Sequence, residues 1–219
     1  ENDVMATLLV KNSAVLVTMD AHHREIEGGG IFVRDGIVEA VGSDADLPGE
    51  ADEVVNTSDC VVLPGLINTH HHFYQNLTRT VPAAQNATLF QWLKTLYPIW
   101  ARMGPEEIQC ATQLALSEMA LAGTTCASDH LYLFPNGARL DDEIEAAEEI
   151  GIRLHATRGA MSIGESNGGL PPDQLVESES HILDDSLRLI QAYHDPRPGA
   201  MIRIGIAPCS PFSVSRELM

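Results

Sequence analysis

The stretch Leu63-Pro64-Gly65-Leu66-Ile67-Asn68-Thr69-His70-His71-His72 joins a Pro-Gly turn, a short apolar strand end and a histidine cluster. Side chains along a strand alternate between its two faces, so His70 and His72 share one face while His71 points to the other. Two imidazoles on one face can bind a single metal ion through their ring nitrogens. We therefore predict that His70 and His72 are metal ligands and that His71 is not.

Downstream of this stretch, short apolar strands alternate with helical patterns. We expect strands over residues 66–69, 124–128, 152–157 and 201–207, and helices over 87–102, 105–122, 141–150 and 180–193, with a further helix beginning at Ser213. Such alternation is typical of parallel βα units. Four units are half of a (β/α)₈ barrel, which needs about 250 residues. We therefore predict an α/β fold in which residues 64–219 supply the first four βα units of a TIM barrel, as the N-terminal half of a longer polypeptide.

A doubly wound open sheet is the alternative fold. It would favour a glycine-rich phosphate loop after the first strand, where this chain has Thr69-His70-His71-His72-Phe73. Placement supports the barrel, because active sites of barrels lie at the carboxyl ends of their strands, where the histidines fall.

Upstream of the histidine stretch, residues 1–63 show only short strand patterns. These patterns lie at residues 7–10, 14–19, 31–34, 37–41, 54–55 and 60–63. Asp35-Gly36 between two of them predicts a hairpin. We expect residues 1–63 to form the N-terminal part of a small β-sandwich module.

The composition limits the partners of the protein. The formal net charge is −18, from 31 acidic and 13 basic residues, which disfavours nucleic acid and an anionic membrane surface. No apolar run approaches the ~20 residues of a membrane-spanning helix, and residues 1–10 lack the pattern of a signal peptide. Four widely spaced cysteines suggest reduced thiols rather than a disulfide framework. We expect a cytoplasmic protein with a small-molecule substrate, and a homo-oligomer.

The order Pro-Gly-Leu-x-Asn-x-His-x-His in residues 64–72 resembles the first barrel strand of the amidohydrolase superfamily, and the resemblance runs along the whole chain. It implies that strands returning from the C-terminus complete the β module. Binuclear members usually carry a bridging carboxylated lysine at the end of the fourth strand. The lysines here are Lys11 and Lys94, neither on an expected barrel strand, and the fourth strand ends Ala207-Pro208-Cys209-Ser210-Pro211. The resemblance therefore implies the mononuclear branch, with one divalent metal ion, zinc expected and Fe²⁺ the alternative.

The same resemblance implies a metal-dependent hydrolytic deaminase. In that branch a His and an Asp from strands five and eight complete the metal site, and the acid–base Glu and a second catalytic His are expected beyond residue 219. Three stretches are most similar to deaminases that convert 8-oxoguanine to urate and ammonia: residues 70–79, 92–98 and 207–213. Guanine or a hydroxylated s-triazine is the alternative substrate. A metal-free scaffold protein on the same fold is the alternative from a different class.

Five further residues are candidates for substrate binding. Gln75 follows the histidines, and its amide offers both a donor and an acceptor, unless it is a solvated loop amide. Trp92 would stack on a flat heterocycle, although a tryptophan at helical spacing is also typical of a core. His130 and Tyr132 end the second strand, where His130 either binds substrate or is satisfied locally. Cys209 ends the fourth strand, as a pocket residue or a buried inert thiol.

Overall fold

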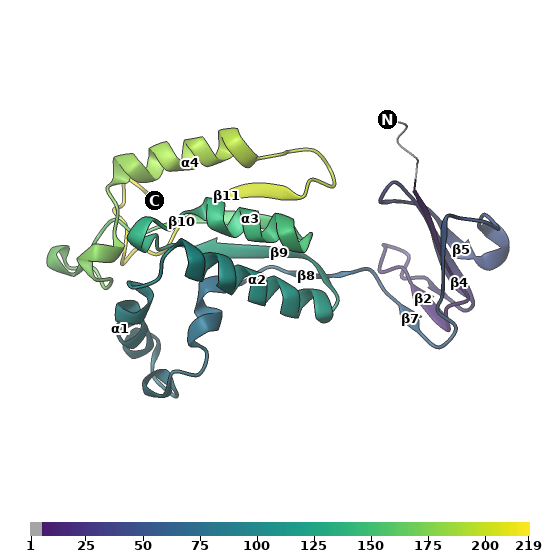
Figure 1. The fold of residues 1–219 in the computed structure, drawn as a ribbon, viewed down its shortest axis with the longest axis horizontal. Helices are drawn as coiled ribbons and strands as arrows, with labels where there is room; N and C mark the ends of the chain where they lie inside the picture. Colours follow the sequence, from purple (N-terminus) through teal and green to yellow (C-terminus); the bar gives the residue numbers. More distant parts are fainter. Residues whose placement is uncertain (1–5) are drawn as a thin grey trace. The chain divides into compact units, whose positions relative to one another are not determined.

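The computed structural model describes residues 6–219 as two compact units (Figure 1). The first unit ends at Gly65 and the second spans Leu66–Met219, close to the boundary expected at residues 63 and 64. Residues 1–5, part of the segment searched for a signal peptide, lie outside the described residues. From residue 6 onward, the helices are too short or too polar to cross a membrane.

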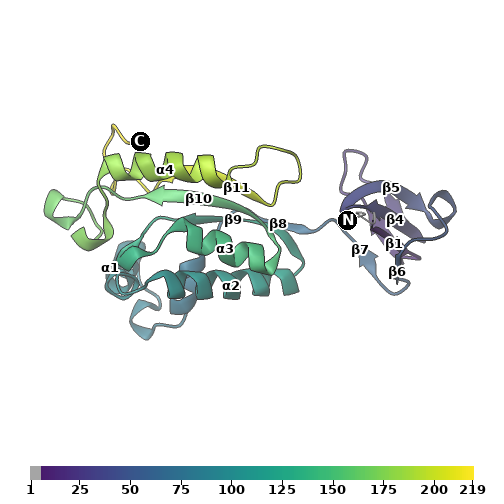
Figure 2. The ribbon, with the colours of Figure 1, turned by 45° about the horizontal axis from the view of Figure 1, so that its top comes forward.

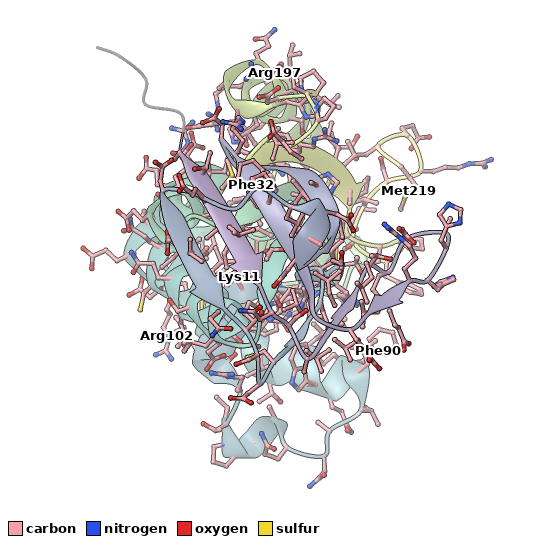
Figure 3. The ribbon with its side chains drawn as sticks, turned by 90° about the vertical axis from the view of Figure 1, so that its right-hand side faces the viewer. Lys11, Phe32, Phe90, Arg102, Arg197 and Met219 are labelled. Atoms are coloured by element: carbon pink, nitrogen blue, oxygen red, sulfur yellow. The ribbon has the colours of Figure 1, made fainter. Side chains whose placement is uncertain are left out.

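The first unit contains strands and one short 3-10 helix. Its strands form a four-stranded sheet in the order β5-β4-β1-β6 and a three-stranded sheet in the order β3-β2-β7. The bounds are β1 Thr7–Lys11, β2 Val15–Val17, β3 Glu25–Ile26, β4 Gly29–Arg34, β5 Ile37–Ser43, η1 Asp44–Asp46, β6 Glu53–Asn56 and β7 Val61–Val62. The buried apolar side chains of this unit are Leu9, Leu16 and Phe32. Phe32 is labelled in Figure 3. The β-sandwich assignment remains a prediction.

The hairpin predicted in this unit is confirmed. Strands β4 and β5 pair antiparallel, with Arg34 opposite Ile37 at the closed end. Asp35 and Gly36 have φ angles of 48° and 76°, the left-handed conformation that both central residues of a type I′ turn require. Aspartate and glycine tolerate this conformation better than most residues, which is why the dipeptide predicts the turn.

The second unit is built on one parallel sheet. Its strands run in the order β11-β10-β9-β8, so each strand pairs with its neighbour in the sequence. The bounds are β8 Leu66–Asn68, α1 Leu89–Trp100, α2 Pro105–Leu121, β9 Thr124–Leu131, α3 Leu140–Ile150, β10 Arg153–Ala160, α4 Glu179–Tyr193 and β11 Ile202–Pro208. Short 3-10 helices are η2 Phe73–Thr78, η3 Pro82–Ala84, η4 Pro135–Gly137, η5 Glu165–Asn167 and η6 Asp173–Leu175. The α/β character is as expected, and closure of the strands into a barrel remains a prediction.

The helices cover the sheet in chain order. Helix α2 packs on β9, α3 on β10 and α4 on β11 (Figure 2). An apolar stripe of α2 is buried at Ile108, Ala111, Ala115 and Met119, while Leu114 is 38% exposed. Burying one stripe of each helix against the strands forms the core of this unit, and it leaves the carboxyl ends of the strands free for a site.

Two sequence expectations needed correction. Strands β9 and β10 extend to Leu131 and Ala160, beyond the ends expected at residues 128 and 157, because main-chain pairing with the neighbouring strand continues through these residues. The helix expected from Ser213 does not form. Residues after Ser213 make turns, with a single helical hydrogen bond from Met219 N to Ser215 O (3.2 Å), and one bond cannot sustain a helix.

Candidate active site

The three histidines lie just beyond β8, at the carboxyl end of the parallel sheet. Strand β8 ends at Asn68, so the histidines follow the strand rather than belong to it. The ladder to β9 nevertheless continues, because His130 N donates to His71 O at 3.0 Å. This bond keeps the segment extended, and the alternation of side chains is preserved.

The rings of His70 and His72 are neighbours in an edge-to-face arrangement. Their centroids are 5.5 Å apart and their planes are perpendicular. Nδ1 of His72 lies 2.7 Å from the carbonyl oxygen of His130. A carbonyl only accepts, so Nδ1 carries the proton and Nε2 keeps its lone pair. Burial lowers the pKa of His72, which keeps the imidazole neutral. These features fit a metal ligand.

His71 has different neighbours. Its Nδ1 lies 3.9 Å from Oδ1 of Asp129, and its ring centroid lies 5.1 Å from that of Phe73. Burial lowers its pKa as well, and Nδ1 has no hydrogen-bond partner. His71 thus has other contacts than His70 and His72, and both the face assignment and the ligand roles remain predictions.

A cavity of about 410 Å³ opens beside His72. All five predicted substrate-binding residues line it: Gln75, Trp92, His130, Tyr132 and Cys209. A neighbouring hollow of about 500 Å³ is lined by His70, His71 and His72, and it shares Gln75 and Trp92 with the first. The tertiary structure therefore brings together residues from α1, from β9 and from the segments that follow β8, β9 and β11.

The apolar wall of the cavity was missed by sequence reasoning. It includes Leu89, Phe90, Leu93, Tyr97, Leu170, Pro171 and Phe212. Leu89 and Phe90 follow the helical spacing of a core stripe, yet they are 66% and 50% exposed. Spacing alone does not separate a helix face that meets a core from one that lines a cavity.

Gln75 and Tyr132 form the polar side of the cavity. Nε2 of Gln75 lies 3.2 Å from the hydroxyl of Tyr74 and 3.3 Å from that of Tyr132. Burial raises the pKa of Tyr132, so its phenol stays protonated and can donate. An amide and a hydroxyl together offer donors and acceptors to the edge of a heterocycle.

His130 is both satisfied locally and part of the cavity wall. Its Nε2 lies 3.0 Å from the carbonyl oxygen of Ala207, on β11, two strands away. The imidazole reaches this carbonyl across Gly159 of β10, where a Cβ atom would stand 2.5 Å from Nε2. The glycine therefore makes the crossing possible.

Trp92 and Cys209 each pack against the core and also line the cavity. Trp92 packs edge-to-face on Trp100, with centroids 5.2 Å apart, and its exposed side lines the cavity. Cys209 is half-buried, and burial raises the pKa of its thiol. A neutral thiol is a poor nucleophile, which agrees with a pocket residue that is not catalytic.

The donors present fit part of a metal site. Within residues 6–219 no group of three or more His, Cys, Asp or Glu side chains is arranged to hold a metal ion. His70 and His72 would contribute two neutral nitrogens, whereas a catalytic zinc site usually has three protein ligands.

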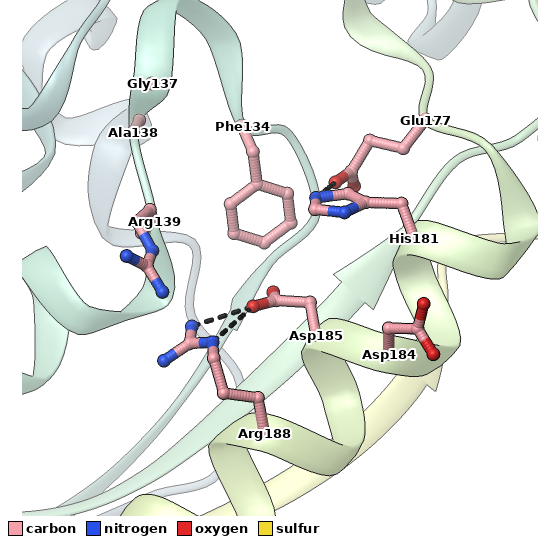
Figure 4. A pocket seen from close by; sticks show the side chains of 9 residues that line it. All are labelled: Phe134, Gly137, Ala138, Arg139, Glu177, His181, Asp184, Asp185 and Arg188. Atoms are coloured by element: carbon pink, nitrogen blue, oxygen red, sulfur yellow. Dashed lines mark hydrogen bonds and ion pairs between the residues drawn. The ribbon is translucent and has the colours of Figure 1, made fainter.

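A separate cavity of about 430 Å³ lies between the loop after β9 and helix α4 (Figure 4). Several of its charged groups are paired with one another: Arg188 lies 2.7 Å from Asp185, and it also lies 2.7 Å from Asp141. Beneath it, the buried Arg158 contacts Glu177 at 2.8 Å and Asp185 at 3.2 Å. None of the predicted site residues line this cavity, so the histidine cavity is the candidate active site.

The chain is similar to known enzymes over most of its length. The chain is 51% identical over 194 residues to an 8-oxoguanine deaminase of Pseudomonas aeruginosa, covering 87% of this chain and 43% of the deaminase. It is 36% identical to the hydroxydechloroatrazine ethylaminohydrolase of Pseudomonas sp. (strain ADP), covering 94% of this chain and 46% of that enzyme.

A crystal structure of an atrazine chlorohydrolase from Arthrobacter aurescens TC1 in complex with zinc superposes with a TM-score of 0.87 at 30% identity, covering 96% of this chain and 48% of that one. The chain thus spans about half the length of these relatives. The sequence pattern of the amidohydrolase family matches residues 61–219, most of the chain. The chain therefore belongs to the amidohydrolase family.

Proposed function

We propose that the protein carrying this chain is a metal-dependent deaminase that hydrolyses 8-oxoguanine to urate and ammonia. The observation that carries the proposal is the pair His70 and His72, which opens on a cavity with a polar side and an apolar wall. The 51% identity to an 8-oxoguanine deaminase supports this substrate. We also propose that the second unit is half of a TIM barrel and the first unit part of a β-sandwich.

His70 and His72 would hold one divalent ion, for which zinc is the first candidate. The zinc in the related atrazine chlorohydrolase structure supports this choice. When bound, such an ion supplies the Lewis acidity that makes water a nucleophile near neutral pH. The remaining ligands and the proton-transferring groups are proposed to lie in a part of the protein outside residues 6–219.

The residues of this chain would bind and orient the base. The cavity volume of about 410 Å³ lies in the usual range of small-molecule sites, roughly 300–1,000 Å³. Trp92 offers a flat face for the purine ring. Gln75 and the protonated hydroxyl of Tyr132 would bond to its polar edge, where 8-oxoguanine carries an extra carbonyl and N–H.

Two alternatives remain on the same scaffold. Guanine or a hydroxylated s-triazine would use the same metal chemistry, and the 36% identity to a hydroxydechloroatrazine ethylaminohydrolase favours the triazine as the second candidate. A metal-free scaffold role is the alternative from another class, and the free Nε2 of His72 counts against it.

Substrate competition tests the proposal. The purified zinc-loaded protein would be assayed for ammonia release from 8-oxoguanine, guanine and a hydroxylated s-triazine at equal concentrations. We expect kcat/KM for 8-oxoguanine to exceed that for guanine by at least about 100-fold, because polar groups built for the 8-carbonyl are left unpaired by guanine. A higher value for guanine or the triazine would replace the substrate. Absence of both bound metal and ammonia release would favour the scaffold role.

A further inference from the structure

The segment that carries the histidines has few anchors of its own. Strand β8 has three residues, it lies at one end of the sheet that the described residues form, and it ends before His70. Beyond Asn68 there are two local bonds, from His70 N to Oδ1 of Asn68 and from Gln75 N to His72 O. The bonds to β9 include those from His130 N to His71 O and from Nδ1 of His72 to His130 O. The third bond to β9 comes from Phe73 N, which donates to Oδ1 of Asp129 at 2.6 Å. A carboxylate therefore replaces a main-chain acceptor directly after His72.

Asp129 accepts this bond from a fully buried position. Its residue exposure is 1%, and no arginine or lysine pairs with it in the described part of the chain. Its neighbour is Glu143 on helix α3, which is also 1% exposed. Within the described residues, no N–H or alcohol hydroxyl donates to Oδ2 of Asp129 or Oε1 of Glu143, and the two carboxyls bond to each other.

Two adjacent buried carboxyls cannot both be ionised at reasonable cost. Burial raises the pKa of Glu143 well above its ordinary value, and the neighbouring Asp129 raises it further. Burial also raises the pKa of Asp129, but the bond from Phe73 N and the bond with Glu143 favour its charged form. Glu143 is therefore the protonated member of the pair, and its carboxyl O–H donates a hydrogen bond to the Asp129 carboxylate.

We propose that Asp129 and Glu143 are positioning residues, which hold the main chain at residues 70–73 so that His70 and His72 converge on one metal ion. Asp129 accepts the hydrogen bond from Phe73 N, and Glu143 supplies the donor that orients the Asp129 carboxylate. Because α3 packs against α2 and β10, the pair ties the ligand segment to the helical layer. The inference rests on the proposed metal role of His70 and His72, and not on the identity of the substrate.

Zinc affinity and hydrogen exchange in four variants test the proposal. Asp129→Ala removes the acceptor, and Glu143→Leu removes the donor at similar volume. Glu143→Gln keeps a neutral donor. Ile144→Ala is the matched control, since Ile144 is a fully buried neighbour on the same helix. Zinc dissociation constants would be measured by chelator competition, and exchange of the amides of residues 70–75 by mass spectrometry in zinc-free protein.

We expect Asp129→Ala and Glu143→Leu to weaken zinc binding by about 10–100-fold, the usual effect of losing a group behind a metal ligand. Both should speed exchange at residues 70–75. Glu143→Gln should stay within about threefold of the unmodified protein, as a retained donor requires. Ile144→Ala should lower the melting temperature without changing zinc affinity or this exchange.

Three results would overturn the proposal. One is unchanged exchange at residues 70–75 in Asp129→Ala, which is measured without zinc and so holds even if the metal proposal fails. Another is zinc affinity that falls equally in Ile144→Ala. The third is Glu143→Gln matching the loss in Glu143→Leu. Zinc binding without turnover of 8-oxoguanine would contradict the proposed substrate and would not affect the inference about Asp129 and Glu143.

Discussion

Two clusters of buried charged groups in the second unit differ in how completely they are paired. Arg158 contacts Glu177, Asp185 and the carbonyl oxygen of Gly159, and its guanidinium lies 4.4 Å from the ring centre of Phe134. Asp129 and Glu143, in contrast, have two buried oxygens that receive no N–H or alcohol hydroxyl within residues 6–219, and their carboxyls have each other as partners.

This difference in pairing suggests that the Arg158 cluster stabilises the fold and that the Asp129–Glu143 pair serves the site. The ion pairs of Arg158 with Glu177 and Asp185 link β10 to α4, and both carboxylates also line the cavity drawn in Figure 4. An incompletely paired carboxyl pair is costly, and such groups tend to occur at functional sites. Here the unsaturated cluster is the one that bonds to the chain beside His72.

The largest expected effect comes from the ligands themselves. His70→Ala and His72→Ala should each weaken zinc binding by more than about 100-fold, because either change removes a ligand nitrogen. His71→Ala should keep most of the zinc. Metal content after dialysis against a weak chelator measures this, with the exposed His22→Ala as a control. Equal loss in all three cluster variants would contradict the face assignment.

The paired cluster should respond in stability alone. Arg158→Met leaves Glu177 and Asp185 without their buried partner, and breaking a buried pair costs about 3–5 kcal/mol. Urea unfolding measures this loss, while zinc affinity should remain unchanged. If zinc affinity also fell in Arg158→Met, the proposed difference in role between the Arg158 cluster and the Asp129–Glu143 pair would be wrong.

Gly159 lies between the clusters, and its substitution should give a smaller effect. A Cβ atom there would stand 2.4 Å from Cβ of Tyr132 and 2.5 Å from Nε2 of His130. We expect Gly159→Ala to lower the free energy of unfolding by about 1–3 kcal/mol and to reduce kcat/KM, because both displaced residues line the cavity. Gly49→Ala is the control, since nothing lies within 4 Å of a Cβ at that position. Equal stability of the two variants would show that the crossing of His130 over β10 is not constrained.

The stability contributed by the Asp129–Glu143 pair should depend on pH. The pKa of Glu143 is raised in the folded state, so the folded protein binds its proton more tightly, and stability is lost as pH rises above the ordinary pKa near 4.5. Glu143→Gln does not titrate. The difference in unfolding free energy should therefore shift in favour of Glu143→Gln between pH 5 and 8, by at most about 1.4 kcal/mol per pH unit. A constant difference would contradict the shared proton.

Several features were predictable because they depend on neighbours in the sequence. Asp35-Gly36 predicted the hairpin through its tolerance of positive φ, and the stripe on α2 followed from helical periodicity. The spacing of His70 and His72 predicted a common face. The five candidate cavity residues came from positions after strand ends or on the following helix, and all five meet at one cavity.

What the sequence determined by itself was the alternation of strands and helices, the turn at Asp35-Gly36 and the His-x-His pattern, because each is a matter of local conformation. Only the tertiary structure decided that Leu89 and Phe90 line a cavity instead of a core, and that residues after Ser213 form turns. It alone joined Asp129 to Glu143. These outcomes depend on which distant side chains become neighbours, and the burial that creates such partners arises only when the elements pack together.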